Sequence, residues 1–304
     1  MNSMTTKIAL LGANGQVGSE LCAVLSQHPQ WEVVPLTRAE LDITDADAVK
    51  RVLSQIAPDI VVNATAYTQV DQAEIEPDIA YAVNTLGPHF LAQYTQSANA
   101  LLLHISTDYV FAGEQAIPYC ETDIPAPVSQ YGLTKLQGES LIEQTCEQYI
   151  ILRTAWVFGK TGNNFVKTML RLAQSHDAIS VVNDQVGTPT YAHDIALTIQ
   201  IILQHYQDHQ LLSKHDTSVS GIYHFSGSPA VSWYEFCEAI FARCPAYSLP
   251  VPQLNSITTA QYPTPAQRPA YSLLANDKIS RIFAIKPSDW QLGLDQLLQD
   301  LTCK

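Results

Sequence analysis

The chain is poor in charged residues, and above all in basic ones. Charged residues make up 15% of its 304 positions, against about 25% in a typical soluble domain. Sixteen basic residues face 29 acidic ones, which gives a net charge of −13. A chain without a basic stripe cannot make the many phosphate contacts on which nucleic-acid binding depends. We therefore expect no nucleic-acid partner, and an anionic small molecule would have to be held by a few local amides and cations.

Long hydrophobic runs are also missing. The longest apolar stretches fall well short of the roughly 20 residues needed to cross a bilayer. The first residues, MNSMTTKIALLG, lack an apolar run long enough for a signal peptide. We expect a soluble, cytoplasmic protein with no membrane partner.

The cysteines show no pattern of pairing. They include no Cys-x-x-Cys motif and no closely spaced histidine, so we expect reduced thiols, mostly in the core, rather than disulfides or a zinc site. The six are Cys22, Cys120, Cys146, Cys237, Cys244 and Cys303.

What the sequence does have is an apolar content of 46% and a regular alternation of short apolar runs with amphipathic segments. This alternation predicts an α/β fold, a doubly wound parallel sheet of the Rossmann type. Strands are expected over 7–13, 31–37, 59–66, 100–107, 149–158, 178–183 and 221–226. Helices are expected over 15–27, 44–57, 76–99, 129–147, 163–175, 191–207 and 232–243.

The alternation of expected strands and helices becomes less regular after about residue 158. Residues 245–269 hold six prolines, so we expect neither strand nor helix to run through them. We predict a dinucleotide-binding core over 1–158 and, over 159–304, a smaller C-terminal substrate-binding lobe interwoven with the core. Thr44, followed by Asp47 three residues later, is the expected N-cap of the helix over 44–57.

A glycine-rich turn follows the first expected strand. Gly12 allows a tight turn, Gly15 lets the backbone approach a pyrophosphate, and Gly18 lets the helix pack closely on the sheet. The amides of Gln16 and Val17 then lie at the positive helix N-terminus, where a phosphate binds. The spacing is G-x-x-G-x-x-G, which a simple glycine turn of any α/β protein also produces. Its position favours dinucleotide binding.

The end of the second expected strand bears on the choice of cofactor. An NAD-selective fold usually has an acidic residue there, whereas this chain has Arg38. Arginine can pair with a 2′-phosphate, which favours NADPH. A solvated surface arginine and use of NADH as well are the alternatives. Further cofactor contacts are expected from Asp42 and Ile43 beside the adenine, and from Ala66, Tyr67 and Thr68 after the third strand.

Tyr131 and Lys135 lie four residues apart and share one helix face. A nearby ammonium stabilises a phenolate, so we expect Lys135 to lower the pKa of Tyr131 and make it a proton donor or acceptor near neutral pH. Thr107 ends a buried strand at the sheet edge where ligands bind, and its hydroxyl could bond a substrate carbonyl or simply cap a turn.

Taken together and in this order, these motifs resemble the extended short-chain dehydrogenase/reductases that act on nucleotide sugars. The finer resemblance is to the dTDP-4-dehydrorhamnose reductase family, and it covers most of the chain. The strings that carry it are GANGQVGSEL (12–21), VNATAYTQVDQAE (62–74), HISTDYVFAG (104–113), YGLTKLQGE (131–139), RTAWVFGKTGNNFVKTMLRLA (153–173), VVNDQVGTPT (181–190) and YPTPAQRPAYSLL (262–274).

The resemblance implies reduction of the 4-keto group of dTDP-4-dehydro-L-rhamnose to dTDP-L-rhamnose, the last step of dTDP-rhamnose biosynthesis. Tyr131 would give the proton to the C4 oxygen, Lys135 would hold the nicotinamide ribose, and Thr107 would complete the catalytic set. The nucleotide-sugar substrate would also meet Asp108, Trp156 and Arg268, the last at its diphosphate.

The resemblance also raises a magnesium site, because some family members bind Mg²⁺ at a carboxylate cluster in a dimer interface. The matching positions here are Glu20, His193 and Asp289. His193 replaces a carboxylate, and Mg²⁺ prefers hard oxygen ligands, so we expect no metal. The oligomeric state stays open, with a homodimer among the options.

Two alternatives remain. An epimerase or dehydratase of the same superfamily is disfavoured because Tyr109, rather than a glutamate, follows Asp108. The fold also resembles that of a non-catalytic regulatory subunit of methionine adenosyltransferase, which binds NADP and a partner enzyme.

Overall fold

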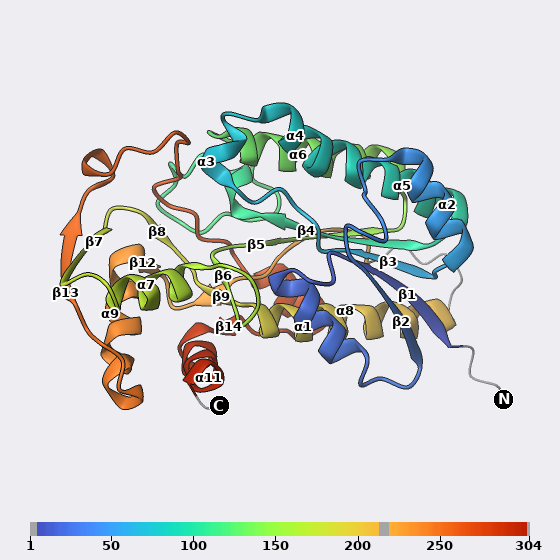
Figure 1. Ribbon diagram of the computed structural model, residues 1–304. Helices are drawn as coiled ribbons and strands as arrows, with labels where there is room; N and C mark the ends of the chain where they lie inside the picture. Colours follow the sequence, from blue (N-terminus) through green and yellow to red (C-terminus); the bar gives the residue numbers. More distant parts are fainter. Residues whose placement is uncertain (1–4, 213–218, 303–304) are drawn as a thin grey trace.

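A six-stranded sheet runs through the centre of the molecule (Figure 1). The computed structural model describes residues 5–212 and 219–302. The strand order is β10-β5-β4-β3-β1-β2, and every neighbouring pair is parallel. The expected doubly wound α/β fold is confirmed.

The sheet strands are β1 (Thr6–Leu11), β2 (Trp31–Leu36), β3 (Ile60–Asn63), β4 (Leu101–Thr107), β5 (Tyr149–Thr154) and β10 (Gly221–His224). The short strands outside it are β6 (Val157–Phe158), β7 (Ala178–Val182), β8 (Val186–Gly187), β9 (Thr190–Tyr191), β11 (Gly227–Ser228), β12 (Val231–Ser232), β13 (Gln253–Ile257) and β14 (Ser288–Asp289).

The α-helices are α1 (Gln16–Leu25), α2 (Ala46–Ile56), α3 (Val70–Ala73), α4 (Pro77–Tyr81), α5 (Gly87–Ala98), α6 (Gln130–Thr145), α7 (Phe165–Ala173), α8 (Ala192–Leu212), α9 (Trp233–Arg243), α10 (Asp277–Phe283) and α11 (Trp290–Thr302). A π-helical segment, η1 (Ala82–Leu86), joins α4 to α5, and short 3-10 turns are η2 (Asp108–Val110), η3 (Cys244–Tyr247) and η4 (Thr259–Gln261).

Helices cover both faces of the sheet. Successive side chains of a strand point to opposite faces, so Ile8 of β1 packs with α1 and α8 while its neighbour Ala9 packs with α2 and α5. Figure 1 shows α1 and α8 on one side of the strands and α2, α5 and α6 on the other. Burial on both faces explains why the strands are nearly continuous apolar runs.

The sheet also fixes where a ligand can bind. The chain moves outward from β1 to β2 and then returns to place β3 on the other side of β1. The loops after β1 and β3 therefore diverge and leave a crevice at the carboxyl edge of the sheet, which is the usual ligand position in such folds.

Segments after residue 158 contribute to both parts of the molecule. Strand β10 forms one edge of the large sheet, and α8 packs beneath it. Helices α7, α9 and α11 form a smaller lobe with its own core, which contains Phe236 and Trp290 and lies at one end of the sheet (Figure 1). The division at residue 158 stays a prediction.

Three local predictions are wrong. The strand expected over 149–158 is interrupted, because β5 ends at Thr154 and β6 pairs with β9 outside the large sheet. The proline-rich stretch 245–269 contains β13 and η4. Ten residues without proline lie between Pro252 and Pro263, and the first five of them pair in parallel with β7. The N-cap of α2 is Asp45, whose side chain accepts a hydrogen bond from the Ala48 amide, while the Thr44 hydroxyl donates to Asp42.

The cysteines and the membrane prediction can be compared with the described residues. The five described cysteines are free thiols, of which Cys22 is partly exposed and Cys120 exposed. Cys303 lies outside the described residues. Within 5–212 and 219–302, no helix is both long and apolar enough to cross a membrane.

Candidate active site

A cleft of about 790 Å³ opens at the carboxyl edge of the sheet, between the loops after β1, β3, β4 and β5. Ten predicted site residues line it: Gly15, Gln16, Val17, Ala66, Thr68, Thr107, Asp108, Tyr131, Lys135 and Trp156. Seven others are not among its lining residues: Gly12, Gly18, Arg38, Asp42, Ile43, Tyr67 and Arg268.

The glycine turn brings main chain close to main chain. Gly12 has a φ of +77°, and a Cβ there would lie 2.7 Å from the Ala64 carbonyl oxygen. A Cβ on Gly18 would lie 2.0 Å from the Gly12 carbonyl oxygen. Gly15 caps α1 without a side-chain hydrogen bond, so the first amides of the helix face the cleft free of a capping side chain. These amides form an anion site of the kind a pyrophosphate needs.

The loop after β3 is held by a residue that the sequence did not single out. Asn84, on the π-helical segment η1, accepts a hydrogen bond from the Tyr67 amide at 2.8 Å and donates to the Tyr67 carbonyl at 3.2 Å. The Tyr67 hydroxyl donates to Glu76. Single π-helical turns often mark functional sites, but no local sequence pattern announces this one.

Tyr131 lies in the first turn of α6, which Ser129 caps. Burial raises the pKa of the Tyr131 phenol to about 12, against the opposing effect of the nearby Thr107 hydroxyl. The Thr107 hydroxyl donates to Asp108, with 3.0 Å between Oγ1 and Oδ1. The expected lowering of the Tyr131 pKa by Lys135 is therefore wrong for this state, and the phenol keeps its proton at neutral pH.

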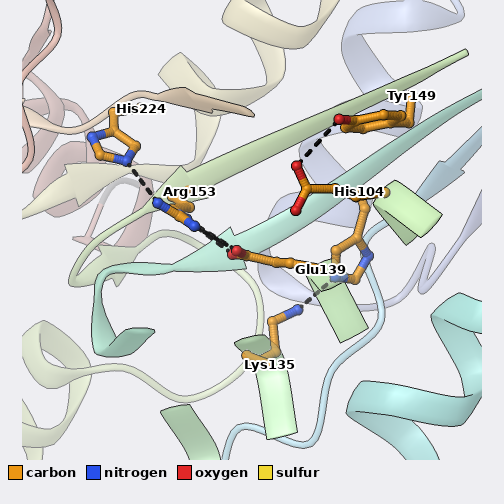
Figure 2. Close-up of polar contacts among 7 residues, drawn as sticks. His104, Lys135, Glu139, Tyr149, Arg153 and His224 are labelled. Atoms are coloured by element: carbon orange, nitrogen blue, oxygen red, sulfur yellow. Dashed lines mark hydrogen bonds and ion pairs between the residues drawn. The ribbon is translucent and has the colours of Figure 1, made fainter. Parts of the chain in front are cut away.

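The Lys135 side chain points toward His104 of the sheet (Figure 2). Its Nζ donates to the Ile105 carbonyl at 2.7 Å and lies 2.9 Å from Nε2 of His104. Burial lowers the pKa of Lys135 to about 8, although the Glu139 carboxylate favours the charged form. That carboxylate is itself bound by the Arg153 guanidinium in a fully buried ion pair.

Three polar atoms in the cleft wall have no hydrogen-bond partner among the described residues. They are Ser106 Oγ, Thr154 Oγ1 and Asp108 Oδ2. Burial raises the pKa of Asp108 to about 6, although the nearby Ser272 and Thr107 hydroxyls favour the carboxylate. Buried polar atoms are rarely left unpaired, so this wall fits a ligand that carries hydroxyl groups.

Trp156 and Trp233 form the aromatic wall of the cleft. Their rings stack with centroids 3.5 Å apart, and Trp156 has a left-handed φ of +46°. Such a backbone costs about 1–2 kcal/mol for a non-glycine residue, which packing must offset. Trp233 follows the N-cap Ser232 of α9, and only the tertiary fold brings it to the cleft.

The predicted adenine-side residues lie outside the cleft. Arg38 is exposed, and its Nε lies 3.0 Å from an oxygen of Asp42. The same Asp42 accepts hydrogen bonds from Thr44, and these interactions lower its pKa against the opposing effect of burial. Ile43 is buried in the core under α5.

Arg268, the expected partner of a diphosphate, is occupied by a carboxylate. Its two terminal nitrogens lie 3.1 and 2.8 Å from the oxygens of Asp71. This forked pair joins the loop before α10 to α3, beside the cleft residue Val70. Arg268 therefore lies near the cleft with its charge already matched.

Two of the three positions that match the magnesium site of some family members lie in contact. His193 Nδ1 is 3.0 Å from a carboxylate oxygen of Glu20. Among the described residues, no three histidine, cysteine or carboxylate side chains come together as a metal site. The absence of a metal stays a prediction.

A family model and two curated relatives match nearly the whole length of the chain. Residues 6–303 match the family model described as RmlD substrate binding domain. The chain is 46% identical to a dTDP-4-dehydrorhamnose reductase of Aggregatibacter actinomycetemcomitans, over 96% of this chain and 98% of that protein. It is 40% identical to one of Sinorhizobium fredii, over 96% of each.

A solved structure shows the same fold. The dTDP-4-dehydrorhamnose reductase of Bacillus anthracis, crystallised in complex with NADP, is similar with a TM-score of 0.88 and 36% identity. The match covers 98% of this chain and 100% of that one.

Proposed function

The chain belongs to the RmlD substrate binding domain family, and on this premise we propose that it reduces dTDP-4-dehydro-L-rhamnose to dTDP-L-rhamnose with NADPH. It is an oxidoreductase of the nucleotide-sugar class, as its relatives are. The observation that carries the chemistry is the protonated phenol of Tyr131, which lines the cleft together with the strand-end hydroxyl of Thr107.

The cofactor fits the first half of the cleft. When bound, NADPH supplies the hydride that adds to C4 of the sugar. The amides of Gln16 and Val17 at the open N-terminus of α1 bind its pyrophosphate, and Ala66 and Thr68 line its path along the loop after β3. Lys135 takes the ribose hydroxyls, at the floor of the cleft.

Tyr131 supplies the proton. As C4 is reduced, negative charge develops on its oxygen, and the phenol donates its proton there. The nearby Thr107 hydroxyl stabilises the phenolate that remains. A positioned general acid of this kind contributes about 10²–10⁴-fold to the rate.

The second half of the cleft suits a sugar. Trp156 offers an aromatic face, while Asp108, Ser106 and Thr154 present unpaired polar atoms to hydroxyl groups. Arg268 takes the diphosphate by exchanging its contact with Asp71 for the phosphate oxygens. We also infer that the protein works in the cytoplasm, where nucleotide sugars are made, and that it assembles as a homodimer.

The test is NADPH oxidation by the purified protein with dTDP-4-dehydro-L-rhamnose, followed at 340 nm and repeated with Tyr131→Phe. We expect rapid, substrate-dependent oxidation that falls about 10²–10⁴-fold in the variant, with NADPH affinity nearly unchanged. Tyr109→Phe, which removes a second phenol from the lining of the same cleft, should lose less than about tenfold.

The two alternatives give different results in this experiment. Substantial turnover by Tyr131→Phe would show that another group is the acid. NADPH binding without any oxidation, together with capture of a partner enzyme, would favour the regulatory-subunit alternative.

A further inference from the structure

His104 on β4 lies between two buried groups, Asn63 and Lys135. Its Nδ1 is 3.0 Å from Nδ2 of Asn63, and its Nε2 is 2.9 Å from Nζ of Lys135 (Figure 2 shows the second contact). All three side chains are at most 1% exposed. Water therefore cannot replace a hydrogen bond between Asn63 and His104, or between His104 and Lys135, if two donors or two acceptors face each other there.

The orientation of Asn63 is fixed by Thr65. The Thr65 amide lies 3.0 Å from Oδ1 of Asn63, and the Thr65 hydroxyl lies 2.5 Å from the same atom. A backbone N–H can only donate, so the oxygen of the Asn63 amide faces Thr65 and its NH₂ group faces His104.

This orientation decides the tautomer of His104. Nδ1 must accept from the Asn63 NH₂ group, and burial holds the pKa of His104 well below its usual value. The ring is neutral, so its single proton is on Nε2. That N–H points at Nζ of Lys135.

An ammonium has three donors and no acceptor, whereas an amine has one lone pair. From the donor–acceptor order along this line, we propose that Asn63 and His104 are positioning residues that hold Lys135 as a neutral amine while no cofactor is bound. The amine accepts from His104 Nε2–H and donates to the Ile105 carbonyl. If Lys135 carried a charge, Nε2 of His104 would have to accept a hydrogen bond, and the ring proton would have to move to Nδ1. There the ring N–H would face the Asn63 NH₂ group, so that two donors would oppose each other.

The other groups around Lys135 are compatible with this state. Glu139, one turn further along α6, favours an ammonium, but Arg153 on β5 binds both of its oxygens. Tyr131, one turn before, keeps its proton. In terms of the proposed function, an amine at Lys135 gives the Tyr131 phenolate no ammonium to stabilise it above about pH 8 before the cofactor binds, so the phenol retains the proton that the reduction consumes.

The first test reads the histidine tautomers by ¹⁵N NMR on the cofactor-free wild-type protein at pH 8.5. His104 should be the Nε2–H tautomer. His224 is an internal control with the opposite expectation, because its Nδ1 lies 3.0 Å from the Tyr119 carbonyl and must donate. His104→Gln and His224→Gln assign the two signals. An Nδ1–H tautomer or an imidazolium at His104 would overturn the proposal.

The second test titrates the protein labelled with [ε-¹³C]lysine, with Lys135→Met to assign the signal. Lys135 should titrate at or below about 8. In His104→Leu the midpoint should rise by about one pH unit or more, which is a tenfold change in proton affinity. His104→Gln, whose amide N–H can still donate, should stay near the wild type.

An unchanged midpoint in His104→Leu contradicts the proposal, and if that variant does not fold, the wild-type tautomer decides. Both measurements are independent of turnover. A protein without reductase activity can still show the predicted tautomer, and an active one can lack it, so failure of this inference is distinguishable from failure of the proposed function.

Discussion

The indole rings of Trp156 and Trp233 stack nearly parallel, with an interplanar angle of 6°. Trp156 follows β5 of the central sheet, whereas Trp233 opens α9 of the smaller lobe. The pair therefore joins the two parts of the molecule at the cleft. Gly187 lies against the same tryptophan, and a Cβ there would be 2.4 Å from Cε2 of Trp156.

Gly187→Ala should weaken substrate binding and spare cofactor binding. The added methyl group displaces the Trp156 ring, because atoms at that separation overlap, and the sugar loses its aromatic wall. We expect KM for the nucleotide sugar to rise about tenfold, equivalent to about 1.4 kcal/mol. NADPH affinity, measured by fluorescence titration, is the internal control, and an equal loss of both affinities would instead indicate general damage to the cleft.

Arg38→Ala should reduce the preference for NADPH over NADH. Its ion pair with Asp42 is exposed, and such pairs contribute about 0–1 kcal/mol, so Arg38 is free to turn to a 2′-phosphate. A charge-assisted hydrogen bond contributes about 1.5–3 kcal/mol, so KM for NADPH should rise roughly 10–100-fold while that for NADH stays constant. Arg51→Ala removes an exposed arginine from α2 as the matched control. Equal weakening of both cofactors would place Arg38 outside the 2′-phosphate site.

The roles of Arg268 and Asp71 can be separated by two single substitutions. If Arg268 exchanges Asp71 for the diphosphate, Arg268→Met should raise KM for the nucleotide sugar about tenfold. Asp71→Asn, which frees the guanidinium, should change it by less than about threefold. A purely structural ion pair gives another pattern, in which both variants lower the free energy of unfolding alike and neither changes KM.

Asp108 should make the protein less stable as the pH rises. Burial raises its pKa to about 6 in the folded protein, above about 3.9 in the unfolded chain. The folded state therefore binds the proton more tightly, and this contribution is complete below pH 4 and lost as the pH passes through 6. Two pKa units correspond to about 3 kcal/mol.

The measurement for Asp108 is urea unfolding between pH 4 and 7. The free energy of unfolding should fall more steeply with pH in the wild type than in Asp108→Asn, which has no charge to bury. Asp47→Asn, at an exposed position on α2, should keep the wild-type slope. Identical slopes for the wild type and Asp108→Asn would mean that the Asp108 carboxyl is solvated.

Several features of this protein were determined by local sequence. Apolar runs bounded by turns predict buried parallel strands, and the glycines at 12, 15 and 18 leave little choice but a tight strand-to-helix turn. Tyr131 and Lys135 share a helix because four residues make about one turn. The family followed from strings spread over nearly the whole chain, and the comparisons confirm it.

Only the tertiary structure decided where the side chains of the site point. Lys135 turns toward His104 rather than Tyr131, Asn84 holds the loop at Tyr67, and Trp233 stacks on Trp156. Strand β13 formed among prolines because β7 was there to pair with it. Each of these contacts joins residues far apart in the chain, or depends on a proton whose position the surrounding donors and acceptors fix. A local sequence pattern predicts which backbone conformation a segment prefers. The residue that the segment contacts is brought to it only when the whole chain folds.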